Sequence, residues 1–171
     1  MMIGVDLRDR DVLVVGGGRV AARRVPALLA ESARVTVVAP VVDPALVRLE
    51  GELTLERRRA RRSDLDGVWF VLAATNDPEL NGRIAAWADK QRVWCVNASR
   101  ADCGSARQAA TTVHGPVVVG VLSLGSPDPR RSVEVRDAVR DLLGSGGVDL
   151  SPRRAASRPL PARNQSETSS A

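Results

Sequence analysis

Aromatic residues are nearly absent from this sequence, which has one histidine, one lysine and no tyrosine among its 171 residues. A hydrophobic core must therefore be built from Val, Leu and Ala. The two cysteines, Cys95 and Cys103, match neither a metal-ligand spacing nor a disulfide framework, which is typical of a reduced, cytoplasmic protein. No apolar run reaches the roughly 18 residues of a membrane span, and the N-terminus lacks the apolar stretch of a signal peptide. We therefore expect no membrane association.

Although lysine is almost absent, the chain is basic, with a net charge of +5 that is carried by arginines. Such a balance invites a nucleic-acid interpretation. The arginine bias is more simply explained by genome composition, and no nucleic-acid-binding module is recognisable, so we expect no nucleic acid among the partners. The densest run, residues 57–62, is interpreted as a solvated strand end, with a carboxylate-binding cleft as the alternative.

Strand-like and helix-like patterns alternate as far as residue 143. Strands are expected at residues 11–15, 34–39, 52–58, 68–74, 92–98 and 116–123. A helix is expected at residues 19–31, and further helices after Asp43-Pro44, Asp77-Pro78 and Asp128-Pro129, where Asp suits the N-cap and Pro the first helical position. This alternation predicts an α/β fold: a Rossmann-type, doubly wound parallel sheet with a short C-terminal helical segment. Residues 144–171, rich in Ser, Pro, Gly and Arg, are expected to be a disordered tail.

The strongest local motif is a glycine turn between the first strand and the first helix. It reads Gly16-x-Gly18-x-x-Ala21, a variant of the dinucleotide-binding pattern. Gly16 permits a tight turn, and Gly18 lets the backbone approach a diphosphate at the positive end of the helix. A purely structural glycine turn is the alternative. The second strand ends at Pro40 and Val41, with neither an acidic residue nor an arginine, which favours NAD over NADP only slightly.

These residues carry a resemblance to a known family. Residues 6–21 and 33–40, together with Val71–Asp77 and Asn81, resemble the precorrin-2 dehydrogenase domain of siroheme synthases. The resemblance implies a homodimeric oxidoreductase that uses NAD to oxidise precorrin-2 to sirohydrochlorin. Some members of the family also insert ferrous iron, so ferrochelatase activity, with ferrous iron as a further substrate, stays open for this chain. The glycine motif gives Gly16 and Gly18 as cofactor-binding residues, and the resemblance adds Arg19, Val20, Pro40, Val41, Thr75 and Asn76.

The same resemblance suggests where the chemistry takes place. The family's acidic residue after the fifth strand aligns with Arg100 here, and Asp102 lies two residues later. We take Asp102 as the candidate proton acceptor, and Arg100 and Arg107 as candidates for binding substrate carboxylates. His114 is interpreted as a turn residue, with a role as general base as the alternative. No metal-binding residue is predicted.

The expected organisation is an NAD-binding domain at residues 1–125, a helical dimerisation segment at 126–143 and the tail. Two other functions stay open. The chain could be a catalytically silent member of the family, because Arg100 replaces the acidic residue. It could also be a nucleotide-sensing module, although such modules normally carry an acidic residue at the end of the second strand.

Overall fold

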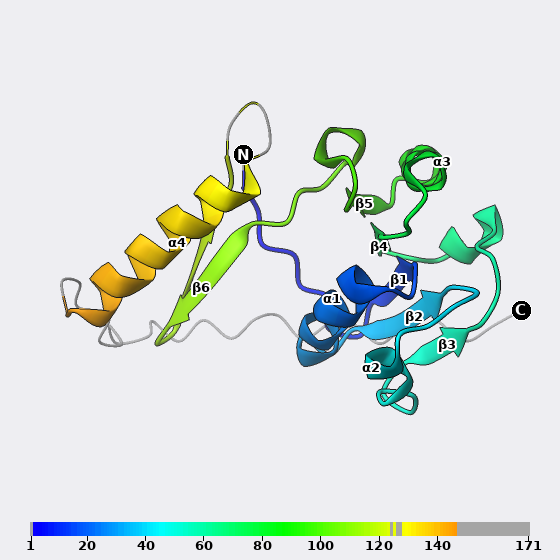
Figure 1. The fold of residues 1–171 in the computed structure, drawn as a ribbon, viewed down its shortest axis with the longest axis horizontal. Coiled ribbons are helices and arrows are strands. Elements are labelled where there is room, and N and C mark those ends of the chain that lie inside the picture. Colours follow the sequence, from blue (N-terminus) through cyan, green and yellow to red (C-terminus); the bar gives the residue numbers. More distant parts are fainter. Residues whose placement is uncertain (1, 124, 126–127, 147–171) are drawn as a thin grey trace, which may run out of the picture.

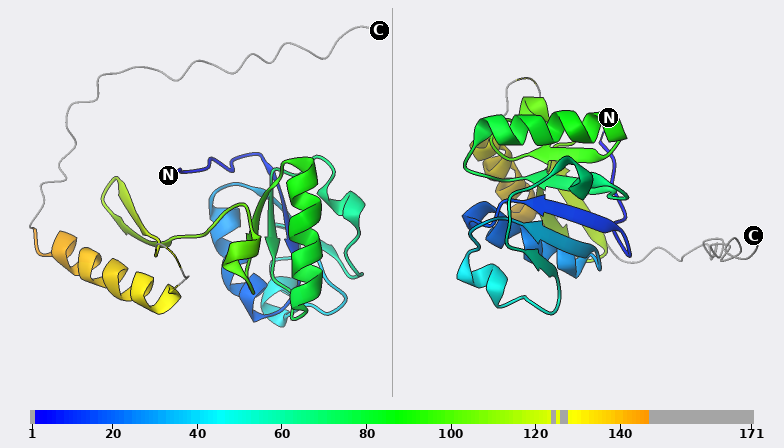
Figure 2. Two further views of the ribbon diagram at one scale, coloured as in Figure 1. Left: turned by 90° about the horizontal axis from the view of Figure 1, so that it is seen from above. Right: turned by 90° about the vertical axis from the view of Figure 1, so that its right-hand side faces the viewer.

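The computed structural model of this chain describes residues 2–123, 125 and 128–146. It consists of two units (Figure 1). The first, called here the body, comprises residues 7–106 and contains a parallel sheet with helices on both faces. The second, called the arm, comprises residues 110–121 and 129–144, and it is a β-hairpin covered by one helix. The arm projects from one side of the body (Figure 2).

The body is built on five parallel strands in the order β3-β2-β1-β4-β5. This order, with the first strand in the middle, matches the Rossmann order 3-2-1-4-5, and the prediction of a doubly wound parallel sheet is confirmed. It brings the carboxyl ends of β1, β2 and β4 to one edge. The strands are β1 (Asp11–Val15), β2 (Arg34–Val38), β3 (Thr54–Glu56), β4 (Phe70–Ala73) and β5 (Trp94–Asn97).

Both faces of the sheet are apolar and buried. Along β1, Val12 and Val14 pack on one face and Leu13 and Val15 on the other, because successive side chains of a strand alternate. The helices α1 (Arg19–Ala30) and α2 (Pro44–Val47) cover the first face. The 3₁₀ helix η1 (Arg62–Leu65) and the helix α3 (Pro78–Gln91) cover the second (Figure 2). The predicted aliphatic core is therefore present.

Three helices begin as their sequences predict. Asp43, Asp77 and Asp128 are the N-caps of α2, α3 and α4 (Pro129–Gly144), and each is followed by proline. Their carboxylate oxygens accept hydrogen bonds of 2.8–3.0 Å from backbone N–H groups of the first turn. These bonds satisfy donors that would otherwise lack a partner at a helix start.

The arm differs from the expectation. The strand predicted at residues 116–123 does not extend the parallel sheet. It forms β7 (Val117–Val121), which pairs antiparallel with β6 (Ala110–His114), a strand that the sequence patterns did not reveal. Only Gly115 and Pro116 separate the two strands, and a link this short permits an antiparallel hairpin but no parallel crossover.

The helix α4 (Pro129–Gly144) packs against both strands of this hairpin. The structural division between the two units therefore precedes β6, whereas the expected boundary was at residue 125. A third short helix, η2 (Ala101–Cys103), follows β5. Residues 147–171, which make up most of the expected tail, lie outside the described residues. Of the helices that are described, none combines the length and apolar character needed to cross a membrane.

Candidate dinucleotide-binding site

A cavity of about 1050 Å³ opens at the carboxyl edge of the sheet. Its walls come from residues 15–20, 38–44, 59–60 and 74–77 and from one face of α3. Ligands of open α/β sheets bind at this edge, where loops leave the strands in opposite directions. The structure places in this wall all eight residues expected to contact the cofactor: Gly16, Gly18, Arg19, Val20, Pro40, Val41, Thr75 and Asn76.

The first two glycines of the turn are required by close packing between strand ends. Gly16 has a φ of +115°, and a Cβ built there would lie 2.4 Å from the carbonyl oxygen of Ala74. At Gly17 a Cβ would lie 2.4 Å from the carbonyl oxygen of Val41. Any larger residue would thus push apart the ends of β1, β2 and β4, so these two glycines shape the floor of the cavity.

Gly18 has a different role, because it faces open space. It is the N-cap of α1, and a Cβ built there would meet no heavy atom within 4 Å. No side chain caps this helix, and its first turn has no acidic residue. Its first amides therefore face the cavity without a side-chain acceptor, at the positive end of the helix dipole. This arrangement fits the diphosphate of a dinucleotide.

Asn81 holds together the segments that leave β4 and β5. This residue of α3 is fully buried. Its side-chain oxygen accepts hydrogen bonds from the backbone N–H of Thr75 at 3.0 Å and from its hydroxyl at 2.7 Å. Its side-chain nitrogen donates to the carbonyl oxygen of Thr75 at 3.0 Å and to the hydroxyl of Ser99 at 3.1 Å. The sequence indicated Asn81 only through the family resemblance, and the structure adds its physical role.

Comparisons with known proteins agree with this geometry. The family model described as "Putative NAD(P)-binding" matches residues 3–108. The solved structure titled "SirC, precorrin-2 dehydrogenase" is similar with a TM-score of 0.66 and 30% identity, over 85% of this chain and 70% of that one. The chain belongs to the precorrin-2 dehydrogenase family. The predicted family is thereby confirmed, and so is a nucleotide-binding domain of the NAD(P) type.

Two curated relatives extend this comparison. Siroheme synthase 1 of Aeromonas hydrophila is 39% identical over 140 residues, which cover 80% of this chain and 30% of the relative. Precorrin-2 dehydrogenase of Priestia megaterium is 44% identical over 79 residues, 45% of this chain and 39% of the relative. The chain thus spans about a third of the length of these members of the family.

The residues that the precorrin-2 dehydrogenase resemblance assigns to chemistry lie beyond β5, outside the cavity wall. A guanidinium nitrogen of Arg100 lies 3.2 Å from a carboxylate oxygen of Asp102, and both side chains are exposed. The hydrogen bond from Arg100 lowers the pKa of Asp102 below its ordinary value, since it stabilises the charged carboxylate. Arg107 takes no part in this ion pair and donates to the carbonyl oxygen of Ser123 at 2.8 Å, next to the arm.

The loop after β5 is organised by Asn97. Its side chain is buried, and its oxygen accepts hydrogen bonds from the backbone N–H groups of Ser99 and Arg100, both at 3.0 Å. Its side-chain nitrogen has no hydrogen-bond partner among the described residues. Asn97 therefore positions the start of the segment that carries Arg100 and Asp102, and sequence patterns gave no sign of this role.

The cavity wall also contains residues that were not among the predicted site residues, including two arginines and a tryptophan. Arg83 and Trp87 lie on α3, and Arg59 follows β3. On α3 the wall residues Leu80, Arg83 and Trp87 are spaced i, i+3 and i+7, which places them on one face of the helix. That spacing is visible in the sequence. The approach of Arg59 to the same cavity depends on the path of the chain between β3 and β4.

Proposed function

We propose that this chain is an NAD-dependent oxidoreductase that converts precorrin-2 to sirohydrochlorin on the route to siroheme. One observation carries the proposal: in a member of the precorrin-2 dehydrogenase family, the open position at Gly18 leaves the first amides of α1 facing a cavity at the carboxyl edge of the sheet. The proposal covers the oxidation alone, and iron insertion is no part of it.

In this proposal each wall of the cavity has a separate task. The backbone at Gly18, Arg19 and Val20 binds the diphosphate. The backbone at Pro40 and Val41 lies where a Rossmann fold places the adenosine ribose. Thr75 and Asn76, held by Asn81, border the part of the edge nearer β4 and β5. Bound NAD supplies the hydride acceptor, and the protein holds the two reacting rings against each other.

Asp102 is the proposed acceptor of the proton that precorrin-2 loses. Its carboxylate is exposed, and the pairing with Arg100 keeps it charged at neutral pH, so it is free to receive a proton. Precorrin-2 carries many carboxylates, and Arg100 and Arg107 are proposed to bind them. A substrate carboxylate that displaces Asp102 from Arg100 would raise the basicity of Asp102 at the moment it is needed.

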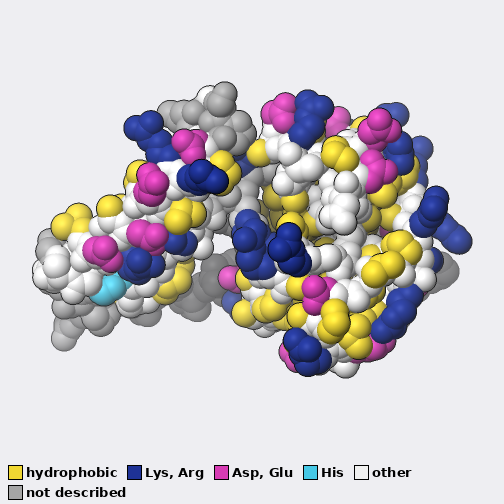
Figure 3. Space-filling view, in the orientation of Figure 1, with side chains coloured by type: hydrophobic (Ala, Val, Ile, Leu, Met, Phe, Trp, Pro, Cys, Tyr) yellow, Lys and Arg dark blue, Asp and Glu magenta, His cyan; other side chains and the backbone are white. Residues whose placement is uncertain are grey.

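We also propose a homodimer, formed through the arm, in the cytoplasm. The hairpin and α4 leave apolar side chains exposed (Figure 3). Val113 is 68% exposed, Val118 64% and Leu142 59%. Exposed apolar surface of this kind on a projecting unit favours burial against a second copy. The expected dimerisation segment, residues 126–143, thereby gains the hairpin as a second component. Both cysteines are unpaired, in keeping with a reduced compartment.

An anaerobic assay tests the proposed activity. The chain is mixed with enzymatically prepared precorrin-2 and NAD, and the absorbance of NADH is followed. Turnover is expected, and Asp102→Ala should reduce it by about two orders of magnitude or more, as loss of a general base does. NAD binding without turnover would favour a silent family member or a nucleotide-sensing module.

The dinucleotide site has its own test, in which NAD binding is measured by calorimetry. Gly18→Val should abolish binding, because its side chain would occupy the space of the diphosphate. Gly82→Val is the matched control, since Gly82 also faces open space but lies outside the cavity wall. If Gly18→Val binds NAD as tightly as the unmodified chain, the proposed function fails.

A further inference from the structure

The wall of the cavity opposite the glycine turn carries two arginines. Arg83 lies on α3 between Leu80 and Trp87, on the helix face that borders the cavity. Arg59 comes from the segment after β3, and it borders the same cavity together with Ala60. The strand order places β3 next to β2, so this segment lies near the end of β2, where the adenosine ribose of a dinucleotide belongs.

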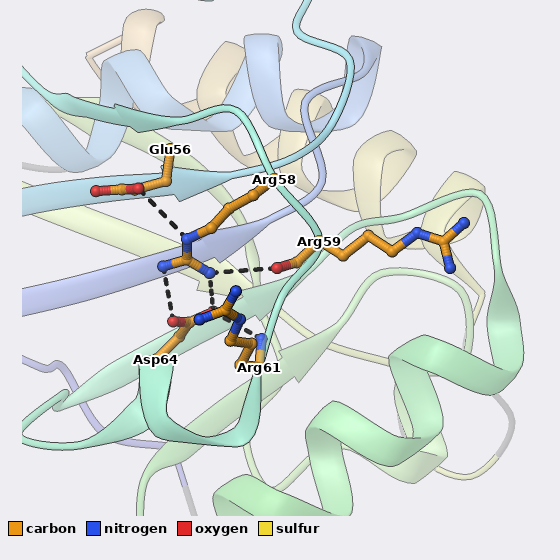
Figure 4. Close-up of polar contacts among 5 residues, drawn as sticks. All are labelled: Glu56, Arg58, Arg59, Arg61 and Asp64. Carbon is orange, nitrogen blue, oxygen red and sulfur yellow. Dashed lines mark hydrogen bonds and ion pairs between the residues drawn. The ribbon is translucent and has the colours of Figure 1, made fainter.

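The segment that carries Arg59 is held rigidly by its neighbour Arg58 (Figure 4). The guanidinium of Arg58 donates two hydrogen bonds of 2.9 Å to the carboxylate of Asp64 and one of 3.2 Å to the carbonyl oxygen of Arg59. It also lies 3.4 Å from Glu56. The backbone N–H of Arg61 donates to Asp64 at 2.8 Å. Asp64, with a side chain only 9% exposed, thus anchors the backbone on both sides of Arg59.

The side chain of Arg59 takes no part in this cluster and points away from it (Figure 4). Within the described part of the chain, neither Arg59 nor Arg83 forms an ion pair. The cavity wall has two acidic residues, Asp43 and Asp77, and both serve as N-caps of helices. Two cationic side chains therefore border the cavity without an anionic partner, and Arg59 follows the strand that lies next to the end of β2.

The residues at the end of β2 also bear on which nucleotide the cavity accepts. A carboxylate at this position selects NAD, because it binds the ribose hydroxyls and repels a phosphate, whereas a nearby arginine accommodates the 2′-phosphate of NADP. Here the position is occupied by Pro40 and Val41, and neither could repel a phosphate. We propose that Arg59 and Arg83 bind the 2′-phosphate of NADP, so that the cavity accepts NADP as well as NAD. This inference rests on the dinucleotide site of the proposed function, and it departs from the preference for NAD that the sequence suggested.

Calorimetric titration of the full chain with NAD and with NADP tests this proposal. We expect the two dissociation constants to agree within about tenfold. Arg59→Ala and Arg83→Ala should each weaken NADP binding by about tenfold, the effect of losing one charge-assisted contact, and change NAD binding by less than about twofold. Arg57→Ala is the matched control, because Arg57 belongs to the same run but pairs with Glu50 and lies outside the cavity wall. It should change neither affinity.

The results of these titrations distinguish a failure of this inference from a failure of the proposed function. If NAD binds and NADP binds more than tenfold more weakly, the inference is overturned and the dinucleotide site stands. Equal losses of NAD and NADP affinity in Arg59→Ala and Arg83→Ala would also overturn it, because the arginines would then act on a part common to both. If the unmodified chain binds neither nucleotide, the proposed function and the inference fail together.

Discussion

The body and the arm bury their apolar residues to very different degrees. In the body, Val12, Leu13, Val14 and Val15 of β1 are all 2% exposed or less, because helices cover both faces of the sheet. In the described part of the arm, only Thr112, Ser132 and Leu143 are buried. A hairpin with one helix has a single covered face, and such a small unit is marginally stable alone. The body can thus support a binding site by itself, whereas the arm has the surface of a unit that needs a partner.

The largest expected contrast comes from two glycines with positive φ. Gly16, in the body, has no space for a Cβ, so Gly16→Ala should lower the free energy of unfolding by roughly 4 kcal/mol or more. Gly115, at the tip of the hairpin, has a φ of +54° and open space around it. There the same change should cost only about 1 kcal/mol, the cost of a left-handed residue.

Urea unfolding followed by circular dichroism measures both losses. If Gly115→Ala destabilised the protein as much as Gly16→Ala, the arm would be as tightly packed as the body, and the comparison would fail.

Two leucines sharpen the contrast in packing. Leu13→Ala, in the centre of the sheet, should cost about 3 kcal/mol, because it leaves a cavity that rigid neighbours cannot fill. Leu143→Ala, in the arm, should cost about 1 kcal/mol, since the thin layer between α4 and the hairpin can collapse. Unfolding at two protein concentrations gives the control: only the loss at Leu143 should depend on concentration if a second copy covers the arm.

This difference also explains how much of the fold could be predicted from sequence. Continuous β-branched runs gave β1 its bounds, and Asp77-Pro78 gave the start of α3, because these signals are local. The strand β6 was missed because Ala110–His114 has neither a continuous apolar run nor a strict apolar–polar alternation, although its threonines suit a strand. The pairing of β7 was also outside the reach of local patterns, because they do not show which strand is its neighbour.

The residues of the candidate site also fall into those that local sequence patterns could predict and those that they could not. The glycine turn is contiguous in sequence, and each requirement at Gly16 and Gly18 follows from backbone geometry. Arg59 and Arg83 border one cavity only through the crossover between β3 and β4, so their joint presence there could be seen only in the structure. The pairing of Asp102 with Arg100 likewise depends on the turn that Asn97 holds. Arg59 and Arg83 are joined by topology, which local patterns do not encode, whereas Arg100 and Asp102 are neighbours in sequence.

A smaller contrast concerns two buried polar side chains. Asn81 joins the ends of β4 and β5 through four hydrogen bonds, and Asn81→Ala should cost about 2–3 kcal/mol because backbone groups of Thr75 lose their partners. Ser132, in the arm, bonds only the carbonyl oxygen of Asp128 in its own helix, so Ser132→Ala should cost less than about 0.5 kcal/mol. Chemical denaturation of both variants is the measurement, and equal costs would contradict the view that the body depends on contacts between distant segments.

The smallest expected effect depends on pH and again separates the two units. Burial favours the neutral form of Asp64, but hydrogen bonds from Arg58 and Arg61 outweigh it, so the pKa of Asp64 lies below its ordinary value. A lowered pKa stabilises the folded state above the unfolded value of about 3.9, and this contribution disappears as the pH falls through the folded value. Asp64→Asn should therefore lower the urea midpoint at pH 7 and have little effect near pH 2.

In the arm, Asp137 pairs with Arg136 and Arg140 at the surface, and Asp137→Asn should leave the midpoint at pH 7 unchanged within error. If Asp64→Asn lowered the urea midpoint equally at pH 7 and near pH 2, the charge of the Asp64 carboxylate would not be what holds the segment around Arg59 in place.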